Sequence, residues 1–378
     1  MRWLAIWYNL AARGCSTAVS VPAFQAGYGG SIPPTRSKDY SLDYSAMTEG
    51  RFGATMEITT KKRLQILTGT YNAQLAEDVA THLEVPLGKV KLSRFANGEI
   101  NCRLGESVRG ADVFVFQAHS PAVNDAIMEQ ALIIDAAKRA SAKRITAVCP
   151  FWGYGKQDRK AAGREPISAK LVVDILSAAG ADRMASVDLH SGQIQGFFDG
   201  PFDHLTAFPL LRDYIKDSLG KDTVVVSPDA GRAKVAERYT RQLGLDLAII
   251  HKVRSHNVAH KLEARAVIGD VKGRPCVIID DMIDTAGTIV AAADILKRNG
   301  AAQIYVLATH GLFSEPAAER LNAAPIDKVV VTDTLSSRAA KHIKNLEVVS
   351  LAPMMAAAVN AIFQDESVSN LFEGENQI

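Results

Sequence analysis

Short apolar runs alternate with longer segments of helical periodicity from about residue 62 onward. The runs most typical of buried strands cover residues 63–67, 113–116, 145–150, 224–226, 277–279 and 304–309. A strand of more mixed composition is expected at 247–254. Because strands alternate with helices along the chain, the pattern predicts an α/β architecture with mainly parallel sheets.

Two stretches of this pattern resemble each other. In the first, strand 113–116, a loop, a helix and a basic turn lead to strand 145–150. In the second, the same order joins strand 277–279 to strand 304–309. The repeat indicates an internal duplication of one domain, with a chance similarity between two βαβ units as the alternative.

A chain of 378 residues is long for one compact unit, so we expect two domains. We place the N-terminal domain at 56–205 and the C-terminal domain at 206–378, with the last helix packing back on the first domain. Residues 1–55 show no sustained period of 2 or 3.6, which is typical of a disordered or non-native extension. Met56 stands just before the first strand and fits an upstream translation start or a dispensable tail, and a transit peptide is the alternative.

The composition, 47% hydrophobic and 22% charged, is that of a soluble globular protein. The net charge of +2 gives no reason to expect a nucleic-acid partner, and no apolar stretch approaches the length of a membrane span. Four scattered cysteines without C-x-x-C spacing favour reduced thiols over zinc ligands or disulfides. They are Cys15, Cys102, Cys149 and Cys276. We therefore expect a cytoplasmic protein.

The most informative chemistry follows the apolar run 277–279. The next residues include Asp280 and Asp281, followed by Asp284, Thr285, Ala286, Gly287 and Thr288. Open α/β sheets bind ligands at the carboxyl ends of strands, where carboxylates can accept hydrogen bonds from vicinal ribose hydroxyls. Small residues let backbone N–H groups approach a phosphate, and a helix starting near Thr288 points its positive end at it. The pattern indicates a site for a phosphorylated ribose, with solvated aspartates and a helix cap at Thr288 as the alternative.

The first copy of the repeat has Gln-Ala-His-Ser-Pro, residues 117–121, at the equivalent positions. It therefore lacks an equivalent ribose-phosphate loop, and we expect its loop to have a different role.

Seven further strings accompany the acidic loop. They are SRFANGEI from Ser93, ESVRGADVFVFQ from Glu106, GYGKQDRK from Gly153, GREPISAKL from Gly163, SVDLHSGQIQGFFD from Ser186, VVSPDAG from Val225 and IIHKVRS from Ile249. The acidic loop resembles the 5-phosphoribosyl 1-diphosphate (PRPP) loop of the type I phosphoribosyltransferase fold. With the strings in this order and spacing, residues 62–372 resemble the class I ribose-phosphate diphosphokinase (PRPP synthetase) family.

The resemblance implies two tandem type I phosphoribosyltransferase-like domains. It implies an enzyme that transfers the β,γ-diphosphoryl group of ATP to the 1-hydroxyl of ribose 5-phosphate, giving PRPP and AMP. PRPP would then serve nucleotide, histidine and tryptophan biosynthesis. The resemblance also implies Mg²⁺ as cofactor, a homohexamer with ATP sites shared between subunits, and phosphate and ADP as allosteric effectors.

The resemblance also assigns substrate-binding residues. For ribose 5-phosphate they are Arg254 and the acidic loop, namely Asp280, Asp281, Asp284, Thr285, Ala286, Gly287 and Thr288. For ATP they are Phe95, Asn97, Gly98, Glu99, Lys156 and Gln157. Phe95 can stack on adenine, while Asn97 and Glu99 offer donor and acceptor groups to its edge. The family has Tyr-Ala-Arg-Gln-Asp where this chain has Lys156, and a lysine lacks the planar fork of an arginine.

For the transfer step the resemblance implies Lys252 and Arg254, which alternate along strand 247–254 and so share a face. For the metal it implies His190 and Asp229, both just after apolar strands. The polar segment 255–265 is expected to form a mobile lid that excludes water.

Three rival functions make different demands on the sequence. A non-catalytic regulatory subunit would be favoured by loss of the acid pair or of Lys252, and all three residues are present. A DNA-binding regulator would need an added helix-turn-helix and a basic face, and neither is found. A true phosphoribosyltransferase would leave the strings SVDLHSGQIQGFFD and FANGE without a purpose. We therefore expect the diphosphokinase, with the non-catalytic regulatory subunit as the alternative.

Overall fold

The computed structural model of the chain describes residues 62–253 and 264–372, and for residues 252, 253, 264 and 265 it describes the backbone only. The predicted extension, 1–55, lies outside these residues.

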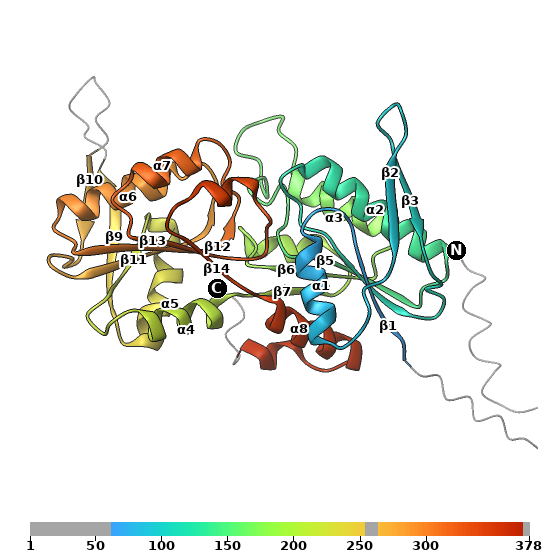
Figure 1. Cartoon of the computed structure of the whole chain (residues 1–378). Helices are drawn as coiled ribbons and strands as arrows, with labels where there is room; N and C mark the ends of the chain where they lie inside the picture. Colours follow the sequence, from blue (N-terminus) through green and yellow to red (C-terminus); the bar gives the residue numbers. More distant parts are fainter. Residues whose placement is uncertain (1–61, 254–263, 373–378) are drawn as a thin grey trace, which may run out of the picture. The chain divides into compact units, whose positions relative to one another are not determined.

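Five parallel strands form the first sheet (Figure 1). In sheet order they are β1 (Leu64–Thr68), β4 (Asp112–Phe116), β5 (Arg144–Cys149), β6 (Arg183–Val187) and β7 (Phe202–Leu205). The helices between them are α1 (Ala73–His82), α2 (Val123–Arg139) and α3 (Ser168–Ala179), with a 3-10 segment η3 (Gly192–Phe197) after β6. An antiparallel hairpin of β2 (Val90–Arg94) and β3 (Ile100–Leu104) stands apart from this sheet and contacts α2.

Seven strands form the second sheet, and only its edge strand β10 is antiparallel to its neighbour. In sheet order they are β10 (Ala264–Ile268), β9 (Asp246–Val253), β8 (Val224–Ser227), β11 (Pro275–Ile283), β12 (Gln303–Gly311), β13 (Lys328–Thr332) and β14 (Leu346–Val349). The α-helices are α4 (Phe208–Ser218), α5 (Ala233–Leu243), α6 (Gly287–Arg298), α7 (Ala317–Ala323) and α8 (Ala352–Gln364). The second half of the described chain also contains the 3-10 segments η4 (Ala230–Arg232), η5 (Arg338–His342) and η6 (Val368–Phe372). Figure 1 shows α6 and α7 on one side of this sheet and α4 and α5 on the other.

The prediction of an α/β fold with mainly parallel sheets is therefore confirmed. One strand end was predicted wrongly, because β11 does not stop at Ile279 but continues to Ile283. Its backbone stays paired with β12 beyond Ile279, with Met282 opposite His310. Backbone pairing does not depend on side-chain polarity, so two aspartates can lie inside a strand.

Side-chain alternation along the strands builds two faces on each sheet. In β4, Val113 and Val115 belong to the apolar cluster of α2 and α3, whereas Phe114 and Phe116 belong to the opposite one. In β11, Ile278 packs with α6, and the preceding Val277 faces the other side.

The apolar cluster that contains Phe114 and Val277 extends through both sheets. It includes the buried side of α8, which lies beside α1 of the first half (Figure 1). At the end of α8, Asp365 pairs with Lys62 at 2.6 Å and with Arg144 at 2.8 Å. The domain boundary between residues 205 and 206 stays a prediction.

In the described part of the chain, no helix is long and apolar enough to cross a membrane. Cys102, Cys149 and Cys276 are free thiols, and burial raises the pKa of Cys149 to about 12.

The shared core predicts a strong effect of truncation in α8. Met355 is fully buried in it, so Met355→Ala should lower the free energy of unfolding by about 2–5 kcal/mol, through lost apolar contact and a residual cavity. The matched control is Met128→Ala in α2, where half of the side chain is exposed and the change should stay within about 0.5 kcal/mol. Urea denaturation of both variants measures the difference, and equal effects would contradict the shared core.

Candidate functional site

Two aspartates of β11 lie at the centre of the candidate site. The side chains of Asp280 and Asp281 are largely buried, 15% and 9% exposed. The chain then turns through Thr285 and Ala286, which has a left-handed φ of 59°, and α6 begins at Gly287, one residue before the predicted start. The acidic pair, the small-residue loop and the helix start are therefore adjacent, as the sequence pattern predicts.

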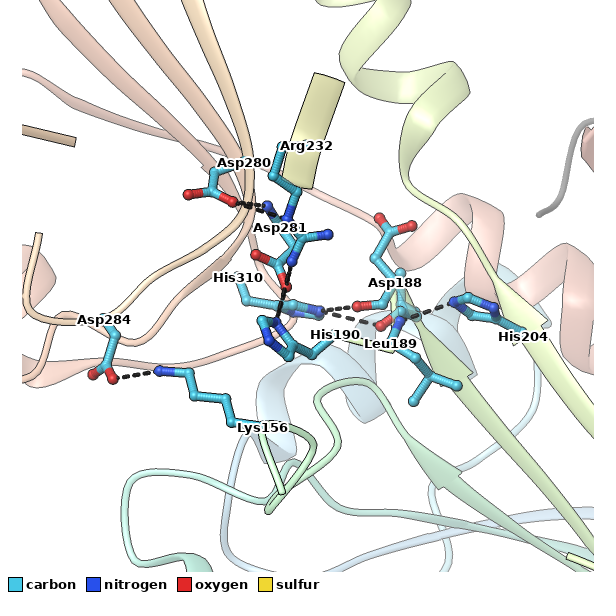
Figure 2. Close-up of polar contacts among 11 residues, drawn as sticks. Lys156, Asp188, Leu189, His190, His204, Arg232, Asp280, Asp281, Asp284 and His310 are labelled. Atoms are coloured by element: carbon cyan, nitrogen blue, oxygen red, sulfur yellow. Dashed lines mark hydrogen bonds and ion pairs between the residues drawn. The ribbon is translucent and has the colours of Figure 1, made fainter. Parts of the chain in front are cut away.

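The acid pair is bound by two side chains from other parts of the fold (Figure 2). Arg232, at the end of η4, ion-pairs with Oδ2 of Asp281 through Nη2 and lies 3.4 Å from Oδ1 of Asp280 through Nε. His190, from the loop after β6, places Nδ1 2.6 Å from Oδ2 of Asp281. Residues of both sheets therefore meet at the acid pair.

These contacts give the two carboxyl groups different pKa values. Burial and the adjacent charge of Asp281 raise the pKa of Asp280. Burial acts in the same direction on Asp281, but the hydrogen bond from His190 and the charge of Arg232 outweigh it and lower its pKa. Asp281 is therefore the firmly ionised member of the pair.

The predicted phosphate loop contacts the predicted nucleotide site. Lys156 Nζ donates to Oδ2 of Asp284 at 2.7 Å (Figure 2). After the opposing effect of burial, this hydrogen bond is the main reason why the pKa of Asp284 is lowered. Lys156 and Gln157 also line a pocket together with Trp152 and with Met282 of β11. Residues assigned to different substrates thus lie side by side.

The other predicted nucleotide residues lie on the β2–β3 hairpin. Phe95 is 55% exposed, and Gly98 has a φ of 93° in the tight turn between the strands. Asn97 Oδ1 accepts from the backbone N–H of Glu99 at 3.2 Å. In the described part of the chain, no hydrogen bond or ion pair joins these residues to Lys156 or Gln157.

The two predicted metal ligands have structural contacts of their own. Asp229 Oδ1 accepts from the backbone N–H of Arg232 at 3.1 Å and so caps η4. Through Arg232 and Asp281, this turn is connected to His190. Among residues 62–253 and 264–372, no group of three or more His, Cys, Asp or Glu side chains is arranged to hold a metal ion.

The predicted cationic pair can be placed only in part. Lys252 belongs to β9, opposite Arg265 of β10. Arg254 and positions 255–263 of the predicted lid lie outside the described residues, and the last two lid positions, 264 and 265, begin β10.

Comparison with known proteins gives a consistent result over most of the chain. Residues 64–180 match the model of the N-terminal domain of ribose phosphate pyrophosphokinase, and residues 256–373 match that of a phosphoribosyl synthetase-associated domain. A ribose-phosphate pyrophosphokinase of Corynebacterium glutamicum is 51% identical over 317 residues, which is 83% of this chain and 97% of that protein. One of Streptomyces coelicolor is 50% identical over 319 residues, 84% of this chain and 98% of that protein.

The chain belongs to the ribose-phosphate pyrophosphokinase family. The crystal structure of phosphoribosylpyrophosphate synthetase from Mycobacterium smegmatis agrees with this membership. It has a TM-score of 0.76 and 49% identity, and the match covers 80% of this chain and all of that one. The predicted family and the predicted fold are thereby confirmed.

Within this pyrophosphokinase fold, Arg232 is a site residue that the sequence did not single out. It directly follows the string VVSPDAG, in which only Asp229 was predicted to have a function. An arginine after a turn is common on protein surfaces, so the residue type alone carries no signal. Its contact with the acid pair depends on how β8 and β11 are paired.

A buried polar junction fixes the loop that carries His190. Asp188 Oδ2 accepts from Thr309 Oγ1 at 2.6 Å, and His310 Nε2 lies 3.1 Å from the carbonyl oxygen of Val187. The same Nε2 lies 3.2 Å from the carbonyl oxygen of Asp188 (Figure 2). Burial lowers the pKa of His310, so it bonds as a neutral ring. This junction joins the end of β6 to β12 and holds His190 near β11.

The loop of the first copy, 117–121, is filled by its own network. His119 is fully buried, with Nε2 2.8 Å from Gln130 Oε1, and its Nδ1 accepts from Gly153 N–H at 3.2 Å. Gln117 donates to the buried carboxylate of Glu129 at 2.9 Å. The sequence predicted correctly that this loop differs from the acidic loop, and its side chains serve packing.

The buried ring of His119 predicts a pH-dependent stability. Burial lowers the pKa of His119 from 6.5 to about 4, so below pH 6.5 the unfolded chain binds a proton that the folded chain does not. The neutral His119 therefore contributes its full share of the unfolding free energy above about pH 6.5. This share, about 3 kcal/mol, is lost as the pH falls toward about 4. His119→Gln, which keeps a donor toward Gln130, should therefore lose less unfolding free energy than the unmodified protein over this range.

Urea denaturation at pH 6.5, 5 and 4 measures the difference. The same substitution at exposed His82 serves as the control. Parallel losses in the His119 variant and the unmodified protein would show the interpretation to be wrong.

Proposed function

We propose that this chain transfers the β,γ-diphosphoryl group of ATP to the 1-hydroxyl of ribose 5-phosphate and releases PRPP and AMP. The observation that carries the proposal is the acid pair with its phosphate loop, placed next to the pocket of Lys156 and Gln157. The names of the relatives, at about half identity over nearly their whole length, support the same reaction.

The acceptor occupies the acidic loop. The 5-phosphate lies on Asp284, Thr285, Ala286, Gly287 and Thr288, where backbone N–H groups at the start of α6 face the anion. Arg320 donates to the carbonyl oxygen of Thr285 at 2.9 Å and steadies this turn. Asp280 and Asp281 accept hydrogen bonds from the ring hydroxyls.

The donor occupies the adjacent pocket, with Lys156 and Gln157 against the nucleotide. Lys156 exchanges its contact with Asp284 for one with ATP. Phe95, Asn97, Gly98 and Glu99 are exposed on the hairpin, a position from which they can recognise adenine in a second copy of the chain. This arrangement requires an oligomer, and we include the homohexamer in the proposal.

The residues that we assign to Mg²⁺ fit a weakly held cation. The second carboxylate oxygen of Asp229 can bind it, and His190 can contact it or a metal-bound water. Magnesium commonly keeps several waters and substrate oxygens, so a dedicated cluster of protein ligands is not required. When bound, the ion would neutralise part of the charge on the diphosphate.

The transfer forms a bond between the anomeric oxygen and the β-phosphorus and breaks the bond from that phosphorus to the oxygen bridging it to the α-phosphorus. AMP leaves with the bridging oxygen and the electron pair of the broken bond, and the hydroxyl proton passes to solvent. Negative charge spreads over the transferred group, and we assign its neutralisation to Lys252 and Arg254. We further propose regulation by phosphate and ADP and a cytoplasmic location.

The alternative function, a non-catalytic regulatory subunit, is disfavoured by the intact acid pair and Lys252. The two functions predict different products. Incubation of the assembled protein with Mg²⁺, ATP and ribose 5-phosphate should give AMP and PRPP in equal amounts. If ADP alone or no product forms, the proposed function is wrong.

Lys252 provides a test of the transfer step. Lys252→Ala should lower kcat by about 100-fold or more, because it removes a charge that stabilises the transition state. The KM for ribose 5-phosphate should change little. Steady-state kinetics measures both, with Lys272→Ala at an exposed position as the control. A large rise in KM at normal kcat would assign Lys252 to substrate binding instead.

A further inference from the structure

Arg232 occupies an unusual position for an arginine of a surface turn. Its side chain is only 20% exposed, and its guanidinium meets two carboxyl groups that are themselves largely buried. Figure 2 shows it between Asp280 and Asp281. None of the functions assigned above uses it.

The geometry of the contact suits a guanidinium and no other side chain. Nε faces Oδ1 of Asp280 and Nη2 faces Oδ2 of Asp281, so one planar group spans both carboxyls. The rigid fork of an arginine can fix two acceptors at once, whereas the ammonium of a lysine is a single point of charge. Arg232 therefore links the two carboxyls to each other, while the backbone N–H of Asp281 also donates to Oδ1 of Asp280 at 2.9 Å.

The backbone of Arg232 is fixed, because its N–H donates to Asp229 Oδ1 at 3.1 Å. His190 Nδ1 binds Asp281 Oδ2, the oxygen that Arg232 contacts. The same oxygen is thus held from the first sheet and from the second.

We propose that Arg232 is a positioning residue for the sugar acceptor. It holds Oδ1 of Asp280 and Oδ2 of Asp281, so that the other oxygen of each carboxyl faces the vicinal hydroxyls of the ribose. It does not touch the reacting atoms. The proposal rests on the proposed function for the identity of the sugar phosphate.

A purely structural role of Arg232 predicts something different. It would lower the stability or the amount of folded protein, without changing how the site distinguishes one sugar from another. A positioning role acts on the hydroxyls that the acid pair accepts. The 2-hydroxyl is one of them, and 2-deoxyribose 5-phosphate lacks it while keeping the 5-phosphate.

The chain offers a matched control in Arg274. Its side chain is 18% exposed and also spans two aspartates, with Nε 3.0 Å from Asp222 and Nη1 2.8 Å from Asp246. Those aspartates are more than two-thirds exposed. Arg274 directly precedes β11, whereas Asp280 and Asp281 lie toward the other end of that strand.

The experiment compares Arg232→Lys, Arg274→Lys and the unmodified protein. Calorimetric titration with ribose 5-phosphate and with 2-deoxyribose 5-phosphate, each with Mg²⁺ and AMP present, gives the dissociation constants. Steady-state kinetics gives kcat and both KM values, and thermal unfolding reports stability. The double variant Arg232→Lys/Asp281→Asn and the single Asp281→Asn complete a cycle.

Arg232→Lys should weaken ribose 5-phosphate binding by about 10-fold, because a single ammonium group cannot span both carboxyls. Binding of the deoxy sugar should change by less than about 3-fold, so the preference for the 2-hydroxyl falls. The KM for ATP should stay the same, and the change should add little to Asp281→Asn. Arg274→Lys should show none of these effects on binding.

The positioning role would be overturned if Arg232→Lys weakened the binding of both sugar phosphates equally. It would also be overturned if kcat and stability fell while the preference for ribose 5-phosphate over the deoxy sugar stayed the same. The proposed function is judged separately, by whether the unmodified protein forms AMP and PRPP. If it binds ribose 5-phosphate without forming them, the function fails while the binding data still test Arg232. If it binds neither sugar, both proposals fail.

Discussion

Two carboxyl groups buried side by side on β11 impose the strictest electrostatic requirement on this fold. A carboxylate taken out of water stays ionised only with hydrogen bonds or an opposite charge close by. Asp281 finds these partners outside its own strand, in Arg232 after β8 and His190 after β6, and Arg232 also lies 3.4 Å from Asp280. The ends of three strands from two sheets must therefore meet at one place, and the candidate site lies where they do.

The apolar core provides the rigidity that this meeting point needs. One cluster runs from Phe114 of the first sheet to Val277 and Leu307 of the second and includes the buried side of α8. Close packing transmits small shifts over such a cluster instead of absorbing them. The junction of Asp188, Thr309 and His310 also links the two sheets, through polar contacts. Displacement of one sheet would disturb both the core and the partners of the acid pair.

The outcome at individual residues shows how far the sequence could be interpreted. The α/β alternation, the start of α6 and the difference between the two repeat loops followed from local patterns and agree with the structure. The end of β11 was predicted wrongly, because hydrophobicity reports burial of side chains and not backbone pairing. Arg232 was missed for a different reason, since a basic residue after a turn has no local feature that separates a site residue from a solvated one. Local patterns also could not show that the hairpin of Phe95 makes no hydrogen bond or ion pair with Lys156 or Gln157 in the described part of the chain.

The sequence by itself determined the fold class, the position of the acidic loop before α6 and, through its strings, the family. These features depend on the order of residues within one strand, turn and helix, where neighbours in sequence are neighbours in space. Only the tertiary structure decided what neutralises the acid pair, how Lys156 meets Asp284, and that His119 is a buried neutral ring. Those contacts join residues from about 10 to about 130 positions apart, and their distances are set by strand order and core packing. The charge and burial of the site residues are thus set by the packing of the two sheets. The sequence shows which side chains are present but not which of them are in contact.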